Sequence, residues 1–397
     1  MISKTKFKIE IIEVAELFKN AGIRNAENIT PLTAGEYNSV FSAAADGLEY
    51  VIKIAPQNNV PVLTYEKDLM RQETRFLTVM KEAEMRVPEI YFSDFSRKNF
   101  PTDYFIMEKL KGKNLAEASP SLSADDKQKI AKKLAETAAK LHTVKYSDLF
   151  KSERNQALKT NSNDETPRFG YLQNGLYSDW YSAIRSMTKN LIFDCEQKRK
   201  RIKKGEKLLD CIEKHKKILQ KVPSALVNFD LWNLNIFPER TKDGFELALI
   251  DPERSFFGDP IADFVCLEPM TFAPEKKTLS ISAYNAYSEE LYNERHINKS
   301  RSNDANQSFP TFGNAAYSQK LYNEHYINKP LSNAENAYPC PPVTFDAEQK
   351  IRYYIAAGYL GFIMATEKFY RYKLTQAKYY INAAASNLYL DTALKNL

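Results

Sequence analysis

The sequence predicts a two-lobed α+β fold, with a small β-rich amino-terminal lobe over residues 1–110 and a larger helical lobe over residues 111–397. The amino-terminal part contains β-forming runs separated by turn residues, whereas apolar side chains recur at helical spacing after Gly112. A length of 397 residues provides enough apolar surface for two hydrophobic cores. The apolar share of 43% and the charged share of 27% are typical of a globular protein and argue against disorder.

The amino-terminal lobe is predicted to contain a helix, a β-hairpin, a second helix and two further strands. Residues 1–22 mix charged and apolar side chains at helical intervals and end in a helix-stop signal. Asp46-Gly47 separates two β-forming runs, which is a strong hairpin signal, and the second run carries Lys53. Residues 64–83 follow a helical period, and the segments PEIYF and DYFIMEKL are predicted strands.

The carboxyl-terminal lobe is predicted to be helical apart from one hairpin. A helix is expected over residues 125–144, two more between residues 177 and 221, and tyrosine-rich helices from Phe345 onward. The hairpin is expected to turn at Asp243-Gly244. Helices are therefore expected on both sides of a short β hairpin, which follows the mainly apolar stretch at residues 226–237.

One segment of this lobe is nearly repeated. AYSEELYNERHINKSRSNDAN from Ala286 resembles AYSQKLYNEHYINKPLSNAEN from Ala316, an offset of 316 − 286 = 30 residues. Two copies are too few for a solenoid, which needs at least about three repeats to bury its faces. The pattern predicts a duplicated surface insertion at about residues 284–336.

Charge and cysteine content argue against several classes of function. The net charge of +6 is mild and the basic residues are dispersed, so no nucleic-acid partner is expected, and the basic stretch at residues 198–209 is predicted to be a solvated helix face. The four cysteines lack paired spacing and indicate neither a zinc site nor disulfides. A signal peptide and a membrane-spanning apolar run are not apparent, which predicts a cytoplasmic protein with no membrane partner.

The stretch LVNFDLWNLNIF, residues 226–237, places Asp230 and Asn235 in an otherwise apolar setting. Phosphoryl transfer needs a carboxylate at the attacking hydroxyl, an oxygen-rich metal site and a cation at the phosphates. Asp230 is the candidate base, and Asn235 and Asp251 are the candidate metal ligands. Lys53 is the candidate phosphate contact, provided that a helix carboxylate such as Glu73 or Glu66 holds it in place. The alternative interpretation is that Asp230 and Asn235 are ordinary turn residues between a strand and a hairpin.

NFDLWNLNIF followed by LIDPERSFFGDPIADF resembles the aminoglycoside phosphotransferase-like family, whose relatives include choline, fructosamine and methylthioribose kinases. The resemblance extends from about Asn28 to Glu268 and implies a protein-kinase-like fold. The family signature, H-G-D-x-x-x-x-N, then I-D-x-E, then G-D-x-x-x-D, falls on Asp230, Asn235, Asp251, Glu253, Asp259 and Asp263.

The resemblance also implies a nucleotide site that binds ATP, or GTP as the alternative, together with Mg²⁺. PLTAGEYNSVF resembles the family's nucleotide-positioning loop and places Asn38 there, although the loop has only one glycine. YVIKIA matches the strand that carries the phosphate-binding lysine, Lys53, and Glu73 is the preferred helix glutamate to pair with it. In YFIMEKLKGKNL, backbone groups from Glu108 to Leu110 are implied to meet the adenine.

Two residues depart from the family signature, because Asn228 stands in place of its histidine and Phe229 in place of its glycine. The histidine is implied to be architectural, and asparagine also donates and accepts hydrogen bonds, so a competent loop with an altered brace is expected. Phe229 requires an apolar environment for its added bulk. Glu66, near the start of the helix that carries Glu73, is interpreted as favouring the positive end of the helix dipole.

Several residues have structural interpretations beside functional ones. A surface lysine and a solvated helix glutamate are the alternatives for Lys53 and Glu73. Glu253 is expected to act on the metal either directly or through another ligand. The residues predicted to be structural are Asp259 as a cap before Pro260, Asp263 as support of the catalytic region, His142 at a helix end, and Trp180 and Trp232 as buried aromatics rather than a sugar pocket.

The sequence thus predicts a small-molecule kinase that transfers the γ-phosphoryl group to a hydroxyl of a sugar, an aminoglycoside or an amino alcohol. The acceptor is expected between Asp230 and the helices of residues 150–221 and the carboxyl terminus. Lysines in those helices argue against polycationic aminoglycosides, which need an acidic pocket. A non-catalytic nucleotide-binding scaffold of the same fold is the alternative, motivated by Asn228 and the glycine-poor loop. The oligomeric state is not predicted.

Overall fold

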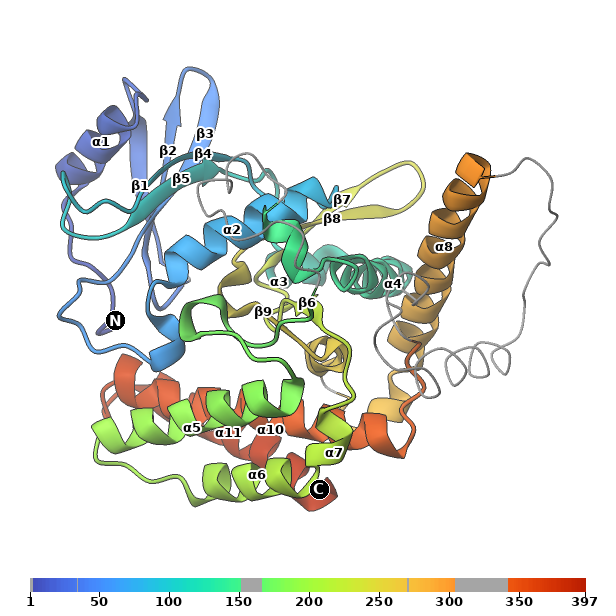
Figure 1. Ribbon diagram of the computed structural model, residues 1–397. Helices are drawn as coiled ribbons and strands as arrows, with labels where there is room; N and C mark the ends of the chain where they lie inside the picture. The colour runs from blue at the N-terminus through green and yellow to red at the C-terminus, as the bar shows by residue number, and fades with distance from the viewer. Residues whose placement is uncertain (1–2, 34, 151–165, 270, 304–341) are drawn as a thin grey trace.

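The computed structural model describes residues 3–33, 35–150, 166–269, 271–303 and 342–397. A β-rich amino-terminal lobe is followed by a larger helical region, and the two are in contact along the helix α2 (Figure 1). The predicted α+β class and the order of its parts are confirmed.

The amino-terminal lobe is built on a five-stranded antiparallel sheet with the order β1-β2-β3-β5-β4. The predicted hairpin joins β2 to β3, and Asp46 and Gly47 at its turn both have positive φ, 51° and 78°, as a type I′ turn requires. The strands are β1 (Glu27–Leu32), β2 (Ser39–Ala45), β3 (Leu48–Ile54), β4 (Ile90–Asp94) and β5 (Tyr104–Glu108).

A helix covers each face of this sheet, α1 (Ile11–Asn20) on one side and α2 (Leu69–Glu82) on the other (Figure 1). Side chains of a strand alternate between the two faces. Ile52 and Ile54 accordingly pack in the cluster that contains the buried side of α1, whereas Val51 packs in the cluster that contains α2. The same alternation directs Lys53 towards α2.

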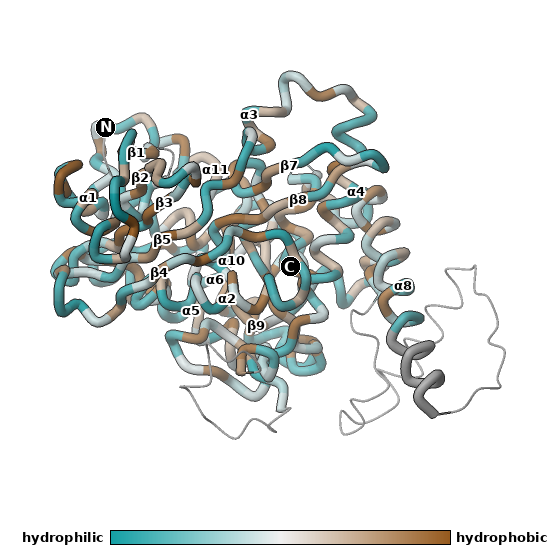
Figure 2. The backbone as a smooth tube through the Cα atoms, turned by 90° about the horizontal axis from the view of Figure 1, so that it is seen from above, coloured by the Kyte–Doolittle hydropathy of each residue, from teal (hydrophilic) through white to brown (hydrophobic). Residues whose placement is uncertain are grey.

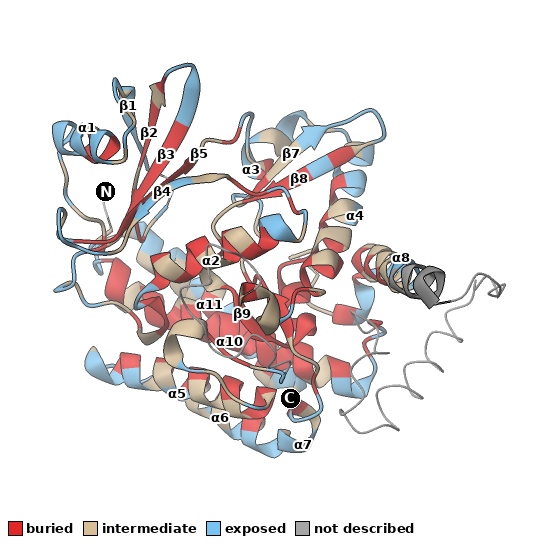
Figure 3. Ribbon diagram, turned by 45° about the horizontal axis from the view of Figure 1, so that its top comes forward, coloured by how far each residue is buried: buried red, intermediate tan, exposed pale blue. Residues whose placement is uncertain are grey.

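The carboxyl-terminal region surrounds one central helix, α10, which is buried along most of its length (Figure 3). Two glycines let neighbouring helices approach it closely: a Cβ added at Gly361 would lie 2.8 Å from the Cβ of Tyr389, and one added at Gly358 would lie 2.8 Å from Leu208. The helices are α3 (Leu115–Ala118), α4 (Ala124–Leu141), α5 (Trp180–Gln197), α6 (Lys203–Lys214), α7 (Lys216–Leu219), α8 (Thr278–Asn303), α10 (Ala347–Arg371) and α11 (Ala377–Asn396).

Two small β pairs hold the segments that carry the predicted chemistry. β6 (Ala225–Val227) pairs with β9 (Phe256–Gly258), and β7 (Ile236–Arg240) pairs with β8 (Phe245–Leu249) in the hairpin that the sequence predicts. The loop of residues 228–235 therefore leaves β6 and enters β7, while residues 250–255 leave β8 and enter β9. Both loops are tethered at each end by a β pair.

The near repeat begins inside α8, which packs along α4 (Figure 1). Tyr284 and Ser288 on this helix are buried, and the hydroxyl of Tyr284 lies 2.8 Å from Nδ1 of His142. Tyr284, the start expected for a surface insertion, is thus a core residue, because it packs against the end of α4. The second copy, from Ala316, lies outside the described residues.

The described helices are amphipathic or mixed in character. Polar and apolar stretches alternate along the chain in Figure 2, and within the described ranges no helix combines the length and apolarity needed to span a bilayer. Within the basic stretch at residues 198–209, Lys203 and Lys207 lie on the exposed side of α6, whose inner side buries Leu208 and Ile212, whereas residues 198–202 precede this helix. The prediction of a solvated helix face is therefore confirmed only from Lys203 onward.

Candidate active site

Lys53 lies between two carboxylates that come from different parts of the fold. Its Nζ atom is 2.7 Å from Oε1 of Glu73 on α2 and 2.8 Å from Oδ1 of Asp251, which follows β8. Lys53 and Glu73 are buried, so the interpretations as a surface lysine and a solvated glutamate are excluded. Burial alone would lower the pKa of Lys53, but the charges of Asp251 and Glu73 outweigh it and raise the pKa, so the lysine remains protonated.

The glutamate near the start of the helix has a different role from the predicted one. Glu66 lies in a short 3₁₀ turn before α2 and is almost fully buried. Its carboxylate accepts hydrogen bonds from the backbone amide of Leu63 and from Arg371 on α10. The helix-dipole interpretation is therefore wrong, because Glu66 precedes the helix and joins the amino-terminal lobe to α10.

Three carboxylates surround the single ammonium group of Lys53. Ligand atoms from Glu73, Asp251 and Glu253 lie within 4.8 Å of one another. Burial raises the pKa of Glu73 and that of Glu253, and the charge of Asp251 adds to the effect on Glu253. Oε2 of Glu73 is buried and has no hydrogen-bond partner within the described part of the chain. An all-oxygen cluster with surplus negative charge fits a divalent cation such as Mg²⁺.

Asp230 and Asn235 are in direct contact in the loop between β6 and β7. Nδ2 of Asn235 donates to Oδ2 of Asp230 at 2.8 Å and to its carbonyl at 3.0 Å. The backbone amide of Ile250, next to Asp251, donates to the carbonyl of Asn235 at 3.0 Å, which ties the two loops together. Oδ1 of Asp230 accepts a hydrogen bond from Nη1 of Arg254 at 3.0 Å. Burial raises the pKa of Asp230, and Arg254 opposes that rise.

The brace of this loop differs from the family's but is complete. Oδ1 of Asn228 accepts a hydrogen bond from the backbone amide of Asp230 at 3.0 Å. The carboxylate of Asp263 accepts from the backbone amides of Asn228 and Phe229 at 3.1 and 2.6 Å, and it also lies 3.0 Å from Nε2 of His142. Asparagine at position 228 thus holds the loop, and the structural interpretations of Asp263 and His142 are confirmed.

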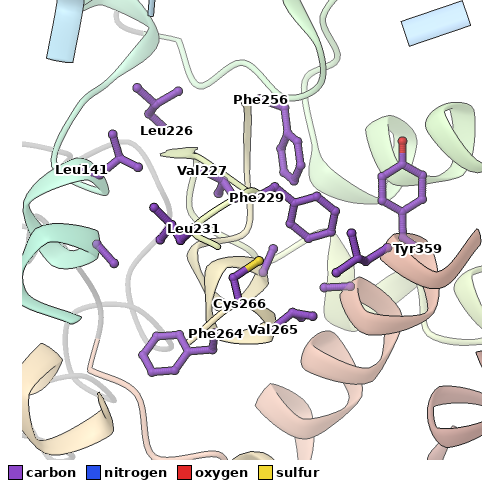
Figure 4. Close-up of a cluster of buried hydrophobic side chains, with 14 of the residues drawn as sticks. Leu141, Leu226, Val227, Phe229, Leu231, Phe256, Phe264, Val265, Cys266 and Tyr359 are labelled. Carbon is purple, nitrogen blue, oxygen red and sulfur yellow. The ribbon is translucent and has the colours of Figure 1, made fainter. Parts of the chain in front are cut away.

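Phe229 lies in an aromatic environment (Figure 4). Its ring is fully buried, with centroids 5.2 Å from that of Phe256 and 6.0 Å from that of Tyr359 on α10. Its backbone is left-handed, with φ 58°, a conformation that favours the glycine of the family signature. The expected apolar environment exists, and ring burial offsets the backbone cost.

Asp259 and Trp180 lie as expected, whereas Trp232 is only partly buried against the core. Asp259 caps the turn that begins at Pro260, accepting from the backbone amide of Ile261, and it forms a buried bidentate pair with Arg352 on α10. Trp180 is buried and stacks on Phe256.

The residues predicted to contact the nucleotide lie at the ends of two inner strands of the amino-terminal sheet, β2 and β5. Asn38 is buried at the start of β2, and its Oδ1 has no partner within the described residues. The backbone amide of Glu108 donates to the carbonyl of Glu89, while the Glu108 carboxylate pairs with Arg86. Leu110 follows at the end of β5, and contacts of these residues with adenine stay a prediction.

Four polar residues next to the catalytic loop were not predicted to act together. Arg254 bridges Asp230 and Glu367, since its Nη2 donates to Oε1 of Glu367 at 2.8 Å. The same oxygen accepts from the Tyr65 hydroxyl at 2.7 Å and from Arg371 at 3.2 Å. Arg254 stands in the quoted DPER sequence, but Glu367 comes from a helix more than 100 residues away and has no local signal.

A β-rich lobe next to a helical one, with a buried Lys–Glu pair and an Asp–Asn loop, defines the kinase-like class of phosphotransferases. The family model described as the phosphotransferase enzyme family (APH) matches residues 28–294. The chain belongs to this family and is a phosphotransferase. In a comparison with curated proteins the chain has no match.

Solved structures show the same fold over nearly the whole chain. A Ralstonia eutropha JMP134 protein assigned as an aminoglycoside phosphotransferase aligns with a TM-score of 0.55 at 14% identity, over 98% of each chain. A thermostable mutant of APH(4)-Ia, in ternary complex with AMP-PNP and hygromycin B, gives 0.52 at 12% identity, over 97% of this chain and 98% of that one. A Haemophilus somnus 129PT protein assigned as a fructosamine-3-kinase gives 0.50 at 13%, over 95% and 96%. The predicted protein-kinase-like fold is confirmed.

Proposed function

We propose that the protein is a kinase that transfers the γ-phosphoryl group of ATP, with GTP as the alternative donor, to a hydroxyl of a small molecule. The observation that supports this most is the position of Lys53, which is buried between Glu73 and Asp251 while the adjoining loop presents Asp230 and Asn235. A buried ammonium group beside surplus carboxylates suits a site that binds a nucleotide together with a metal ion.

The proposed nucleotide site uses residues of both lobes. Lys53, held by Glu73, contacts the phosphates, and backbone groups of Glu108 and Leu110 contact the adenine. Asn38 offers a side-chain oxygen, just before β2, that has no hydrogen-bond partner among the residues described. Together these residues hold the nucleotide, the phosphoryl donor, in place for transfer to the acceptor.

The proposed metal site consists of Asp251 and Asn235, with Glu253 close enough to contribute. Mg²⁺, when bound, neutralises charge that develops on the phosphates. The amide of Asn235 donates to Asp230 through nitrogen, which leaves its oxygen directed away from that hydrogen bond. The protein supplies oxygen ligands from two tethered loops, so binding requires little rearrangement of the backbone.

Asp230 is the proposed base and orienting group for the acceptor hydroxyl. Its carboxylate is held from one side by Asn235 and from the other by Arg254, so its rotation is restricted. A carboxylate fixed within hydrogen-bond reach of the acceptor hydroxyl orients a lone pair of the hydroxyl oxygen towards the γ-phosphorus. It also accepts the hydroxyl proton as the new oxygen–phosphorus bond forms.

The charge around Asp230 favours sugars and amino alcohols over polycationic aminoglycosides. Arg254 compensates the charge of Asp230, and Glu367 is engaged by Arg254, Arg371 and Tyr65. A polycation gains little from carboxylates that are already paired with arginines. The basic face of α6 is solvated, so it does not contribute to this argument.

The test is nucleotide consumption with a panel of sugars, amino alcohols and aminoglycosides, followed by detection of the phosphorylated acceptor. Asp230→Asn is expected to lower kcat by about 100-fold or more while the KM for ATP changes little. Asp243→Asn, in the exposed turn between β7 and β8, is the matched control and should retain activity. Failure of the wild-type protein to phosphorylate any acceptor would overturn the proposal.

The alternative is a nucleotide-binding scaffold without transferase activity, motivated by Asn228 and the glycine-poor loop. It predicts that the wild-type protein binds ATP but forms no phosphorylated acceptor. The hydrogen bond from the Asp230 amide to Asn228 supports the catalytic proposal instead, because it keeps the loop braced without the histidine.

A further inference from the structure

We propose that Glu367 is a positioning residue for phosphoryl transfer, acting on Asp230 through Arg254. The inference rests on the proposed function, since it assigns a partner to the proposed base. Glu367 belongs to α10, beyond the residues 28–294 that match the family model. The carboxyl-terminal helices thereby contribute to the catalytic loop.

The relay consists of two hydrogen-bonded ion pairs that share one guanidinium group. Nη2 of Arg254 donates to Oε1 of Glu367 at 2.8 Å, and Nη1 donates to Oδ1 of Asp230 at 3.0 Å. Because a guanidinium group is planar and rigid, fixing one of its nitrogens also fixes the direction of the other. The position of Glu367 therefore sets the direction from which Asp230 is held.

Glu367 is itself held firmly. It is only 4% exposed, and Oε1 also accepts from the hydroxyl of Tyr65 at 2.7 Å and from Nη2 of Arg371 at 3.2 Å. Burial alone would raise its pKa, but Arg254 and Arg371 outweigh burial and lower it, so the carboxylate is charged. Its helix approaches α11 closely at Gly361, where an added Cβ would lie 2.8 Å from the Cβ of Tyr389.

Asp230 needs a second holding contact because one hydrogen bond leaves a carboxylate free to rotate. The terminal torsion of an aspartate is broad and roughly two-fold, so it is fixed mainly by its partners. Asn235 holds Oδ2 and Arg254 holds Oδ1. Displacing a reacting group by about 1 Å can lower a rate by about 100-fold, so loss of one contact should be visible in kcat.

A buried cluster of charges is weak as a device for stability alone. Desolvation of buried ions often cancels their mutual attraction, and apolar residues of similar size can be as stable. In this cluster, however, Arg254 donates to the proposed base, Asp230, and Tyr65, which donates to Glu367, belongs to the turn that precedes the helix of Glu73. The arrangement thus connects α10 to both of the predicted catalytic elements.

The experiment measures kcat and KM for ATP in Glu367→Ala, Glu367→Gln and Arg254→Met, with the acceptor that the panel identifies. Glu367→Ala and Arg254→Met are expected to lower kcat by about 10- to 100-fold and to change the KM for ATP by less than about twofold. Glu367→Gln keeps an oxygen that can accept from Arg254, so it should recover most of the activity lost in Glu367→Ala. Arg97→Met removes another carboxylate-paired arginine, that of Asp103, and is the matched control with unchanged kcat.

The double variants with Asp230→Asn separate positioning from general damage. If Glu367 acts through Asp230, then Glu367→Ala should cause no further loss of γ-labelled phosphate transfer once Asp230 is replaced. An equal loss in both backgrounds, or a kcat for Glu367→Ala within about twofold of the wild type, would overturn the inference while the proposed function stands. A wild-type protein that phosphorylates no acceptor would overturn both.

Discussion

Replacement of Phe229 tests whether packing or backbone conformation decides the stability of the catalytic loop. The ring is 0% exposed and contacts Phe256 and Tyr359, so Phe229→Ala should leave a cavity and cost about 4 kcal/mol, within the usual range for a buried phenylalanine. The left-handed backbone, with φ 58°, costs a residue with a Cβ atom about 1 kcal/mol more than glycine. Phe229→Gly should therefore lose about 3 kcal/mol, although it removes one carbon more than Phe229→Ala.

Urea unfolding followed by tryptophan fluorescence measures these differences locally. Trp180 stacks on Phe256, the neighbour of Phe229, and both tryptophans of the chain belong to the carboxyl-terminal region. Phe193→Ala is the matched control, because that ring is half exposed on α5 and its loss should change the free energy of unfolding by less than about 0.5 kcal/mol. If Phe229→Ala stays within about 1 kcal/mol of the wild type, the packing argument is wrong. If Phe229→Gly is less stable than Phe229→Ala, the backbone argument is wrong.

Three further perturbations probe other parts of the structure. Mg²⁺ without nucleotide should stabilise the wild type by about 2.7 kcal/mol at 100 times its Kd, which is measured as a rise in Tm. Asp251→Asn should abolish this rise, and an equal rise in the variant would contradict Asp251 as a ligand. Burial lowers the pKa of Lys277 from 10.5 to about 8. Between pH 8 and 10.5 the unfolded chain therefore binds one proton more than the folded chain, and the free energy of unfolding should rise with pH. Urea unfolding should show this rise, up to about 3 kcal/mol, relative to Lys277→Met. Parallel curves for the two proteins would refute this. Arg352→Met leaves Asp259 buried without its partner and should cost about 3–5 kcal/mol in unfolding free energy, part of which Asp259→Asn should restore; a loss below about 1 kcal/mol would show that the pair is dispensable.

The elements that the sequence predicts well are those defined by local patterns. The first hairpin follows from Asp46-Gly47, because positive φ at both positions of a two-residue turn is favoured by those residue types. The second hairpin forms at the predicted Asp243-Gly244, but its loop spans the four residues 241–244, of which only Gly244 has positive φ. The pairing of Lys53 with Glu73 is predicted from the resemblance to the family, since periodicity alone does not choose between Glu73 and Glu66 as the partner. Local periodicity therefore gives the elements of the amino-terminal lobe, and the resemblance gives the pairing within the candidate site.

The contacts that the sequence does not predict join distant parts of the chain. Glu367 and Arg371 resemble any polar pair at i, i+4 on a helix, and only the packing of α10 under the catalytic loop shows that both are buried. Glu66 was assigned to the helix dipole for the same reason, since its partner Arg371 is 305 residues away. The boundary between the lobes at residue 110 and the contacts of Leu110 with a nucleotide stay predictions.

The central position of α10 has a consequence for any shortened form of the protein. A fragment that ends with the family match at residue 294 would lack Tyr359, which packs against Phe229, Arg352, which pairs with Asp259, and Glu367. Its exposed apolar surface would favour aggregation before any loss of chemistry could be observed. A shortened form of this phosphotransferase that is to fold on its own should therefore include α10, and protein engineering should treat that helix as part of the enzyme.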